Sequence, residues 1–206
     1  MTATRSFRRI AALVATAAIT ITACGGDDPT LSGYERTPAP EVGGIVLPNL
    51  TDGGSDFAMR ANPGELLLVY FGYTNCPDYC PTTMSDVKLA RNELDDELDA
   101  RLDIAMVTID PDRDLELLPA YVGGFMADGI ALGTAEAGAL ADAAAPFGAA
   151  YSVEEAEDGG EPIVGHSTSL YAVDENGTLV LTWPFGVGIE ELATDFEILL
   201  DRVDDA

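Results

Sequence analysis

The sequence LLLVYFGYTNCPDYCP, residues 66–81, joins a continuous apolar run to a pair of cysteines. Residues 66–71 are all apolar or aromatic and lie between Gly64 and Gly72, which is typical of a strand covered on both faces of a sheet. Such a strand belongs at the centre of a fold. The sequence therefore predicts a buried central strand that ends a few residues before Cys76.

Helical and strand patterns alternate after this strand. Apolar residues recur at steps of three and four positions over residues 81–98, which predicts an amphipathic helix. Residues 102–109 read as a second buried strand, and the segments 114–125 and 134–147 as two further helices. Because strands that alternate with helices usually pair in parallel, this order predicts an α/β protein.

The pattern changes toward the end of the chain. Residues 169–173 and 178–183 flank Asn176-Gly177, a strong β-hairpin signal, and residues 189–203 predict a last amphipathic helix. Residues 43–50 are expected to supply an N-terminal edge hairpin. The whole order is that of a thioredoxin-like fold, in which helices flank a central mixed β-sheet.

Composition limits the classes of function. The 206 residues include 10 Lys and Arg against 36 Asp and Glu, for a net charge of -26, so no basic surface is available to bind nucleic acid. The 47% of hydrophobic residues is enough to build a core. The chain has one His and three Cys, so a zinc site made of Cys and His ligands alone would use all four.

The amino terminus has the pattern of an export signal. Arg8 and Arg9 precede an apolar run over residues 10–21, which is too short for a comfortable membrane span. The run ends in ITACG, residues 21–25, which resembles a bacterial lipobox and implies cleavage before Cys24 and lipid attachment to its sulfur. An uncleaved anchor or an ordinary signal peptide is the alternative, and the arginine pair leaves the export route open between Sec and twin-arginine.

These features predict three parts of the chain. Residues 1–23 are expected to be a lipoprotein signal peptide, residues 24–42 a flexible acylated tether, and residues 43–206 the folded domain. The mature protein is expected to be extracytoplasmic and held at the cell membrane by its lipid.

The remaining cysteines form a pair. If Cys24 carries lipid, Cys76 and Cys80 are left, and their i, i+4 spacing places both on one face of a helical turn. Pro81 suits a helix start, where the positive end of the helix favours a thiolate. In an exported protein such a pair forms a disulfide, binds a metal ion, or does both at different times.

The fold prediction brings His166 toward the same place. If the strand beginning at Ser169 is antiparallel to the two parallel strands, it starts at the sheet edge where those strands end. Two thiolates and an imidazole suit copper, while zinc is also chemically permitted. Asp110, at the end of the second strand, is the carboxylate best placed to act as an auxiliary ligand.

Three motifs closely resemble the Sco/SenC family of copper proteins. They are YFGYTNCPDYCP (residues 70–81), VTIDPDRD (residues 107–114) and GHSTSLY (residues 165–171), in this order. The resemblance extends over about residues 43–203.

The resemblance implies a membrane-tethered thioredoxin-like domain that binds copper, as Cu(I) or Cu(II), through Cys76, Cys80 and His166. It suggests a role for Asp110 in metal binding or transfer. It also implies a metallochaperone rather than an enzyme, whose partners are a copper donor protein and the copper-bearing subunit of cytochrome c oxidase, where it helps to assemble the binuclear copper centre.

Other functions for the cysteine pair stay open. A thiol-disulfide oxidoreductase would use Cys76 to attack and Cys80 to resolve, and it would reduce the cysteines of a partner protein. Reductases of this fold usually carry a CxxC motif that faces a cis-proline, whereas residues 166–169 contain no proline. A peroxide-reducing cysteine is weakened by the position of Thr74, two residues before Cys76 instead of three. A domain without metal or redox chemistry is the remaining alternative.

Overall fold

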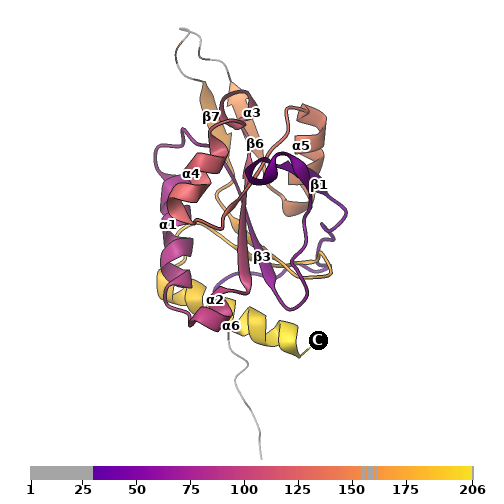
Figure 1. The fold of residues 1–206 in the computed structure, drawn as a ribbon, viewed down its shortest axis with the longest axis vertical. Helices are drawn as coiled ribbons and strands as arrows, with labels where there is room; N and C mark the ends of the chain where they lie inside the picture. Colours follow the sequence, from indigo (N-terminus) through magenta and orange to yellow (C-terminus); the bar gives the residue numbers. More distant parts are fainter. Residues whose placement is uncertain (1–29, 155, 157–159, 161, 206) are drawn as a thin grey trace, which may run out of the picture.

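The computed structural model describes residues 30–154, 156, 160 and 162–205. Its main feature is a seven-stranded sheet in the order β2-β1-β5-β4-β3-β8-β9. Figure 1 shows how the chain is arranged around this sheet. The strands of this sheet are β1 (Val46–Asn49), β2 (Ser55–Ala58), β3 (Leu66–Gly72), β4 (Leu102–Thr108), β5 (Ile130–Leu132), β8 (Leu170–Val173) and β9 (Leu179–Trp183). A separate hairpin consists of β6 (Tyr151–Glu154) and β7 (Ile163–His166).

Helices flank the sheet. The α-helices are α1 (Tyr79–Arg91), α2 (Asp96–Asp99), α3 (Pro111–Asp114), α4 (Leu118–Phe125), α5 (Ala137–Ala144) and α6 (Ile189–Asp204), and two 3-10 turns are η1 (Leu50–Asp52) and η2 (Ala145–Phe147). This arrangement confirms the predicted thioredoxin-like α/β fold with a mixed central sheet.

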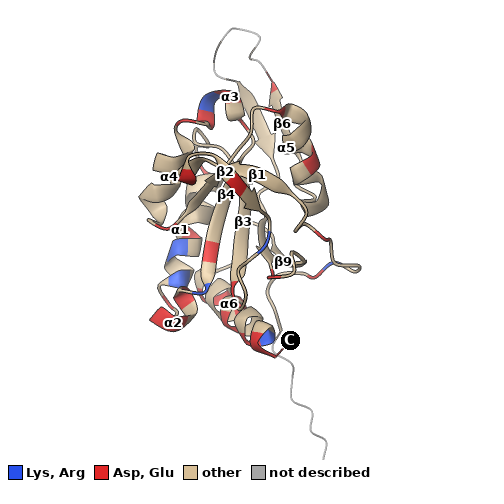
Figure 2. Cartoon of the chain, turned by 45° about the vertical axis from the view of Figure 1, so that its right-hand side comes forward, with Lys and Arg blue, Asp and Glu red and all other residues tan. Residues whose placement is uncertain are grey.

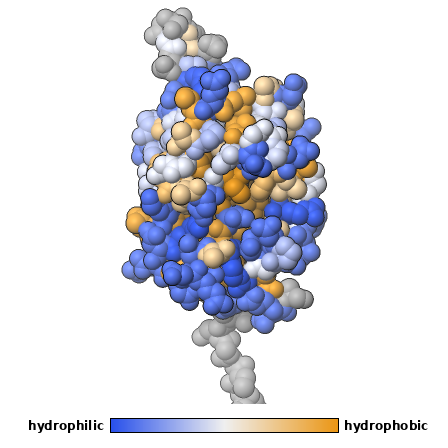
Figure 3. All heavy atoms as spheres, in the orientation of Figure 1, coloured by the Kyte–Doolittle hydropathy of each residue, from blue (hydrophilic) through white to orange (hydrophobic). Residues whose placement is uncertain are grey.

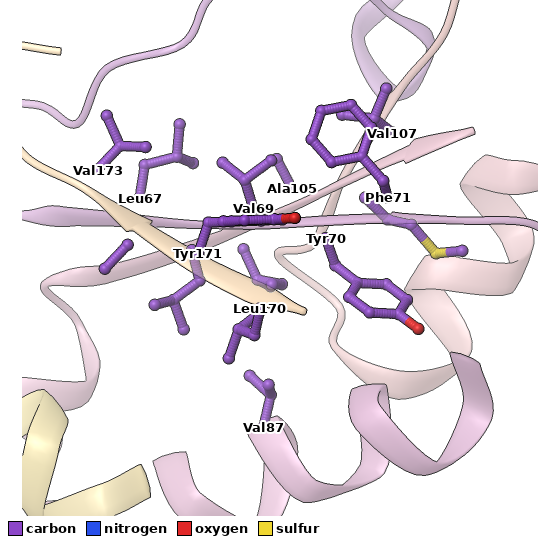
Figure 4. Packing of buried hydrophobic residues seen from close by; sticks show 14 of the residues in the cluster. Leu67, Val69, Tyr70, Phe71, Val87, Ala105, Val107, Leu170, Tyr171 and Val173 are labelled. Atoms are coloured by element: carbon purple, nitrogen blue, oxygen red, sulfur yellow. The ribbon is translucent and has the colours of Figure 1, made fainter. Parts of the chain in front are cut away.

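Strand β3 lies near the centre of the sheet and is buried along its full length. It pairs in parallel with β4, where Leu68 lies opposite Ile104, and antiparallel with β8, where Tyr70 lies opposite Leu170. Figure 4 shows Tyr70 and Phe71 on opposite faces of this strand. Because side chains alternate along a strand, β3 contributes to the core on both sides of the sheet.

The terminal hairpins agree with the sequence prediction. Strands β8 and β9 form an antiparallel hairpin whose turn contains Gly177 with φ of 80°, a conformation that glycine adopts at little cost. Strands β1 and β2 form an edge hairpin as expected, but only β1 lies within the predicted segment 43–50, and β2 lies wholly after it.

Several predicted elements differ in detail. The helix expected over residues 81–98 is two helices, because Asp95 caps α2 by accepting hydrogen bonds from the backbone N–H groups of Glu97 and Leu98. Of the segment 114–125, only residues 118–125 form a helix, α4, because Asp114 is the last residue of the short helix α3. Strand β5 and the β6–β7 hairpin were not predicted, because strands this short carry too few residues to show a period of two.

The chain before β1 is more ordered than the expected tether. The backbone N–H of Tyr34 donates to the carbonyl of Thr182, that of Leu179 donates to Pro40, and Val42 is fully buried. The prediction of a flexible tether over residues 24–42 is therefore wrong for its second half, which pairs with the outer edge of β9.

A buried carboxylate holds this segment in place. Asp195 of α6 accepts hydrogen bonds from the backbone N–H groups of Ser32 and Gly33, and also from the indole N–H of Trp183. The expected signal peptide over residues 1–23 and the lipidation site Cys24 lie outside the described residues.

Charge is spread unevenly over the surface. Acidic residues gather on α2 and α6, at one end of the domain (Figure 2). Hydrophilic residues cover most of the same end in Figure 3, whereas apolar residues reach the surface farther from it. Within the part of the chain that the structure describes, no helix is long and apolar enough to cross a membrane.

Candidate metal centre

Three side chains from separate elements converge beyond the carboxyl ends of β3 and β4. Cys76 lies in the loop after β3, Cys80 is the second residue of α1, and His166 is the last residue of β7. The Nε2 atom of His166 lies 3.9 Å from the Sγ of Cys76 and 3.6 Å from the Sγ of Cys80. The three potential ligand atoms all lie within 4.8 Å of one another.

The imidazole presents an unprotonated nitrogen to the sulfurs. The Nδ1 atom of His166 lies 2.7 Å from the carbonyl oxygen of Ser167. Because a carbonyl only accepts, Nδ1 carries the ring proton and Nε2 keeps a free lone pair. Burial also lowers the pKa of His166, which favours this neutral form.

Two tyrosine rings hold the orientation of the imidazole. The ring of Tyr73 lies edge-on to His166 with a centroid distance of 5.7 Å, and that of Tyr70 lies edge-on at 6.2 Å. Sequence reasoning missed both contacts, although both tyrosines stand within two residues of Gly72 in the motif quoted first. These rings limit the movement of the imidazole away from the sulfurs.

Both cysteines are free thiols and both are buried. The Sγ of Cys76 accepts a hydrogen bond of 3.3 Å from the backbone N–H of Cys80, at the start of α1. Burial raises the pKa of Cys80 to about 12, and the neighbouring Cys76 adds to this shift. The expectation that the helix start favours a thiolate is therefore wrong for Cys80, where desolvation dominates and keeps this thiol protonated at neutral pH.

Gly72 makes the close packing around Cys80 possible. A Cβ atom added at this position would lie 2.8 Å from Cε1 of Tyr70, 2.9 Å from Sγ of Cys80 and 2.9 Å from Cε of Met106. Only a residue without a side chain lets the end of β3 approach the sulfur this closely.

Asp110 does not join the cluster. Its buried carboxylate accepts hydrogen bonds from the guanidinium of Arg113, and its backbone N–H donates to the hydroxyl of Thr108. The carboxylate is therefore engaged in an ion pair, and the structure does not support its expected role as an auxiliary ligand.

Asp114, in the same motif, supports the cysteine loop instead. Its fully buried carboxylate accepts hydrogen bonds from the backbone N–H and the hydroxyl of Thr74, at 2.9 and 2.5 Å, and from the hydroxyl of Thr108 at 2.7 Å. These bonds tie the loop that carries Cys76 to the end of β4. The sequence singled out Asp110 by its place at the end of a strand and carried no signal for the role of Asp114.

The donor set fits one soft or borderline metal ion. Sulfur donors lie about 2.3 Å and nitrogen donors about 2.0 to 2.1 Å from a bound first-row ion, so a sulfur and a nitrogen that bind the same ion lie no more than about 4.4 Å apart. The sulfur–nitrogen separations of 3.9 and 3.6 Å meet this limit. Thiolate ligands select soft ions, and a neutral imidazole also accepts copper or zinc.

Two thiols and an imidazole thus come together at one edge of the sheet of a thioredoxin-like domain. Comparison with known sequences gives the particular family. The chain belongs to the SCO1/SenC family, whose sequence model matches residues 49–201.

Individual relatives agree with this membership. The SCO2-like protein RP587 of Rickettsia prowazekii is 30% identical over 141 residues, which are 65% of this chain and 65% of that relative. The solution structure of apo Sco1 from Thermus thermophilus is 26% identical, covers 87% of this chain and 99% of its own, and has a TM-score of 0.67. Yeast Sco1 with copper bound is 24% identical, covers 81% of this chain and 91% of its own, and has a TM-score of 0.67.

Proposed function

We propose that this protein is a copper metallochaperone that binds one copper ion through Cys76, Cys80 and His166. The convergence of two thiol sulfurs with a free imidazole nitrogen is the observation that carries this proposal. Copper is the cargo that best matches two sulfurs and one nitrogen, and the solved yeast relative contains it.

The surroundings of the site suit binding followed by transfer. Cys76 and Cys80 lie at the start of a helix, and His166 approaches from a different hairpin, so copper is held from two separate parts of the fold. A three-ligand site leaves room for a ligand from a partner protein. Copper then passes by ligand exchange, with one bond to the partner forming as one bond to this protein breaks.

The recipient in this proposal is the binuclear copper centre of cytochrome c oxidase, on the copper-bearing subunit. Support comes from the family, since a solved relative is described as a member of the Sco family of cytochrome c oxidase assembly proteins. A separate copper donor protein would load the site. The high acidity of the chain favours partners with basic surfaces.

We also propose that the protein works outside the cytoplasm, anchored to the cell membrane by lipid on Cys24. The lipobox-like sequence over residues 21–25 supports this anchoring. Residues 32–42 run along the folded domain, so the segment that links the lipid to the domain ends near Ser32. Metabolic labelling with a fatty acid, compared between the full chain and its Cys24→Ala variant, tests the anchor.

Copper titration of the reduced full chain tests the metal site. We expect one Cu(II) per chain with intense sulfur-to-copper charge-transfer absorption. His166→Ala is expected to abolish this band while Cys76 and Cys80 still form a disulfide with a mild oxidant, which serves as the control for folding. An unchanged copper spectrum in His166→Ala would show that the ligand assignment is wrong.

The free dithiol supports a second candidate function, thiol-disulfide exchange. Cys76 is 7% exposed and Cys80 is fully buried, an asymmetry that fits an attacking thiol and a resolving thiol. This alternative predicts reduction of a partner disulfide that copper chelation does not affect and that His166→Ala does not abolish. The two functions therefore predict opposite sensitivity to the same variant.

A further inference from the structure

The hydroxyl group of Tyr70 makes no hydrogen bond of regular geometry although the residue is fully buried, and the side chains that interact with this hydroxyl are those of Thr83 and Cys80. A buried hydroxyl without a partner costs roughly 1 to 3 kcal/mol, so such groups are uncommon in folded proteins and call for an explanation. The loss of this hydroxyl would leave a phenylalanine, which packs equally well in an apolar core. The Tyr70 hydroxyl beside the metal centre therefore points to a hydrogen bond that forms fully only when the metal is bound.

The ring of Tyr70 lies directly beside Cys80. Its Cε1 atom and the Sγ of Cys80 lie 2.8 and 2.9 Å from the same point, the position that a Cβ on Gly72 would occupy. These two distances place Cε1 and Sγ within about 5.7 Å of each other, and the hydroxyl is attached to Cζ, the ring atom bonded to Cε1. Figure 4 shows the ring on the side of β3 that faces Val87 of α1, the helix that carries Cys80.

The ring has little freedom to turn elsewhere. It packs edge-on to His166 at a centroid distance of 6.2 Å, and it lies between β3 and α1 in a fully buried position. The hydroxyl also keeps its proton under ordinary conditions, because burial raises the pKa of Tyr70. Tyr70 therefore remains a hydrogen-bond donor close to the sulfur.

We propose that the Tyr70 hydroxyl donates a hydrogen bond to the Sγ of Cys80 when that sulfur binds copper as a thiolate. A thiol sulfur is a weak acceptor, whereas a metal-bound thiolate carries negative charge and accepts strongly. The inference rests on the proposed copper function and adds a tuning residue to it. Tyr70 acts through Cys80 and does not itself touch the metal.

Such a bond has two measurable effects. It stabilises the sulfur lone pairs, so it raises the energy of the sulfur-to-copper charge transfer. It also stabilises the loaded site relative to the free thiol, by an amount equivalent to roughly three- to tenfold in affinity for a single hydrogen bond.

The test compares Tyr70→Phe with Tyr121→Phe in the full chain. Tyr121, on α4, also has a buried hydroxyl without a hydrogen bond of regular geometry, and it lies close enough to Cys80 and Cys76 to feel their charge without bonding to either, so the control removes the same atom from a second tyrosine near the site. We expect Tyr70→Phe to move the Cu(II) charge-transfer band to longer wavelength and to weaken Cu(I) binding roughly three- to tenfold in chelator competition. Tyr121→Phe is expected to change neither quantity.

A band that stays in place in Tyr70→Phe, or one that moves equally in Tyr121→Phe, would overturn the inference. Cobalt(II) provides an independent probe, because it binds sulfur and imidazole and has its own thiolate charge-transfer band. A wild-type chain that binds cobalt but not copper would refute the copper function, and the cobalt band of Tyr70→Phe would still test the hydrogen bond. Copper binding with an unshifted band would leave the function intact and refute the role of Tyr70.

Discussion

The Nε2 atom of His166 lies 3.6 Å from the Sγ of Cys80, although 86 positions separate the two residues in the chain. Strand β8 makes this approach possible, because it runs antiparallel to β3 and begins at the edge of the sheet where β3 ends. The proposed copper site therefore depends on the strand order as much as on the cysteine motif.

Copper affinity should rise with pH. Burial raises the pKa of Cys80 to about 12, so this thiol is protonated at neutral pH and must lose its proton when it binds metal as a thiolate. His166 contributes no such proton near pH 7, because burial lowers its pKa and the ring is already neutral. We expect at least one proton to be released per copper, and an affinity that rises about tenfold per pH unit for each proton released.

Calorimetry in buffers of different ionisation enthalpy measures the number of protons released. An affinity that stays constant between about pH 6 and 8 would contradict the assignment of Cys80 as a ligand that loses its proton on binding.

Asp114→Ala should weaken the metal site as well as the fold. The variant removes the acceptor for three hydrogen bonds, two of which hold Thr74 in the loop that carries Cys76. We expect a loss of about 1 to 3 kcal/mol in the free energy of unfolding, because buried donors lose their partner. Copper affinity should also fall, since the loop is no longer held in place for binding; chemical denaturation and chelator competition measure the two effects.

Asp112→Ala is the matched control, because Asp112 is an exposed carboxylate in the same helical turn. Equal losses in the two variants would indicate a general effect of charge and not a specific support of the cysteine loop.

Gly72→Ala should disturb the site directly. The added methyl group would lie 2.9 Å from the Sγ of Cys80 and 2.8 Å from the ring of Tyr70, so at least one of them must move. We expect a destabilisation of about 1 to 3 kcal/mol together with a changed copper charge-transfer band.

Gly138→Ala, in α5, provides the comparison, since a Cβ there meets nothing within 4 Å. That substitution should stabilise the helix by roughly 0.5 to 1 kcal/mol and leave the copper spectrum unchanged. A Gly72→Ala chain with the wild-type spectrum would show that the packing around Cys80 is looser than the structure indicates.

Asp195→Ala should release the segment before β1. The backbone N–H groups of Ser32 and Gly33 and the indole N–H of Trp183 would lose their shared acceptor. We expect a loss of about 1 to 3 kcal/mol in the free energy of unfolding and faster proteolysis within residues 32–42. Limited proteolysis followed by mass spectrometry locates the cut sites.

Asp201→Ala removes an exposed carboxylate from the same helix and should leave the proteolysis pattern unchanged. If Asp195→Ala is cut no faster than this control, the pairing with β9 is sufficient to hold the segment.

Local patterns in the sequence predicted the elements with strong internal signals. The continuous apolar run of β3 and the Asn176-Gly177 turn between β8 and β9 each show their structure within a few residues. Strand β5 and the β6–β7 hairpin gave no comparable signal, since three or four residues are too few to define a period and depend on pairing with neighbours.

The sequence by itself determined the chemistry available to this protein: two cysteines one helical turn apart, a single histidine, and a strand long and apolar enough to lie at the centre of a sheet. Only the tertiary structure decided which partner each aspartate of the 107–114 motif has. Asp110 forms an ion pair with Arg113, and Asp114 accepts a hydrogen bond from Thr74. It also decided that residues 32–42 belong to the domain. The physical reason is that composition and spacing act within a segment, whereas the partner of a buried carboxylate or of an unpaired strand edge is supplied by another part of the chain.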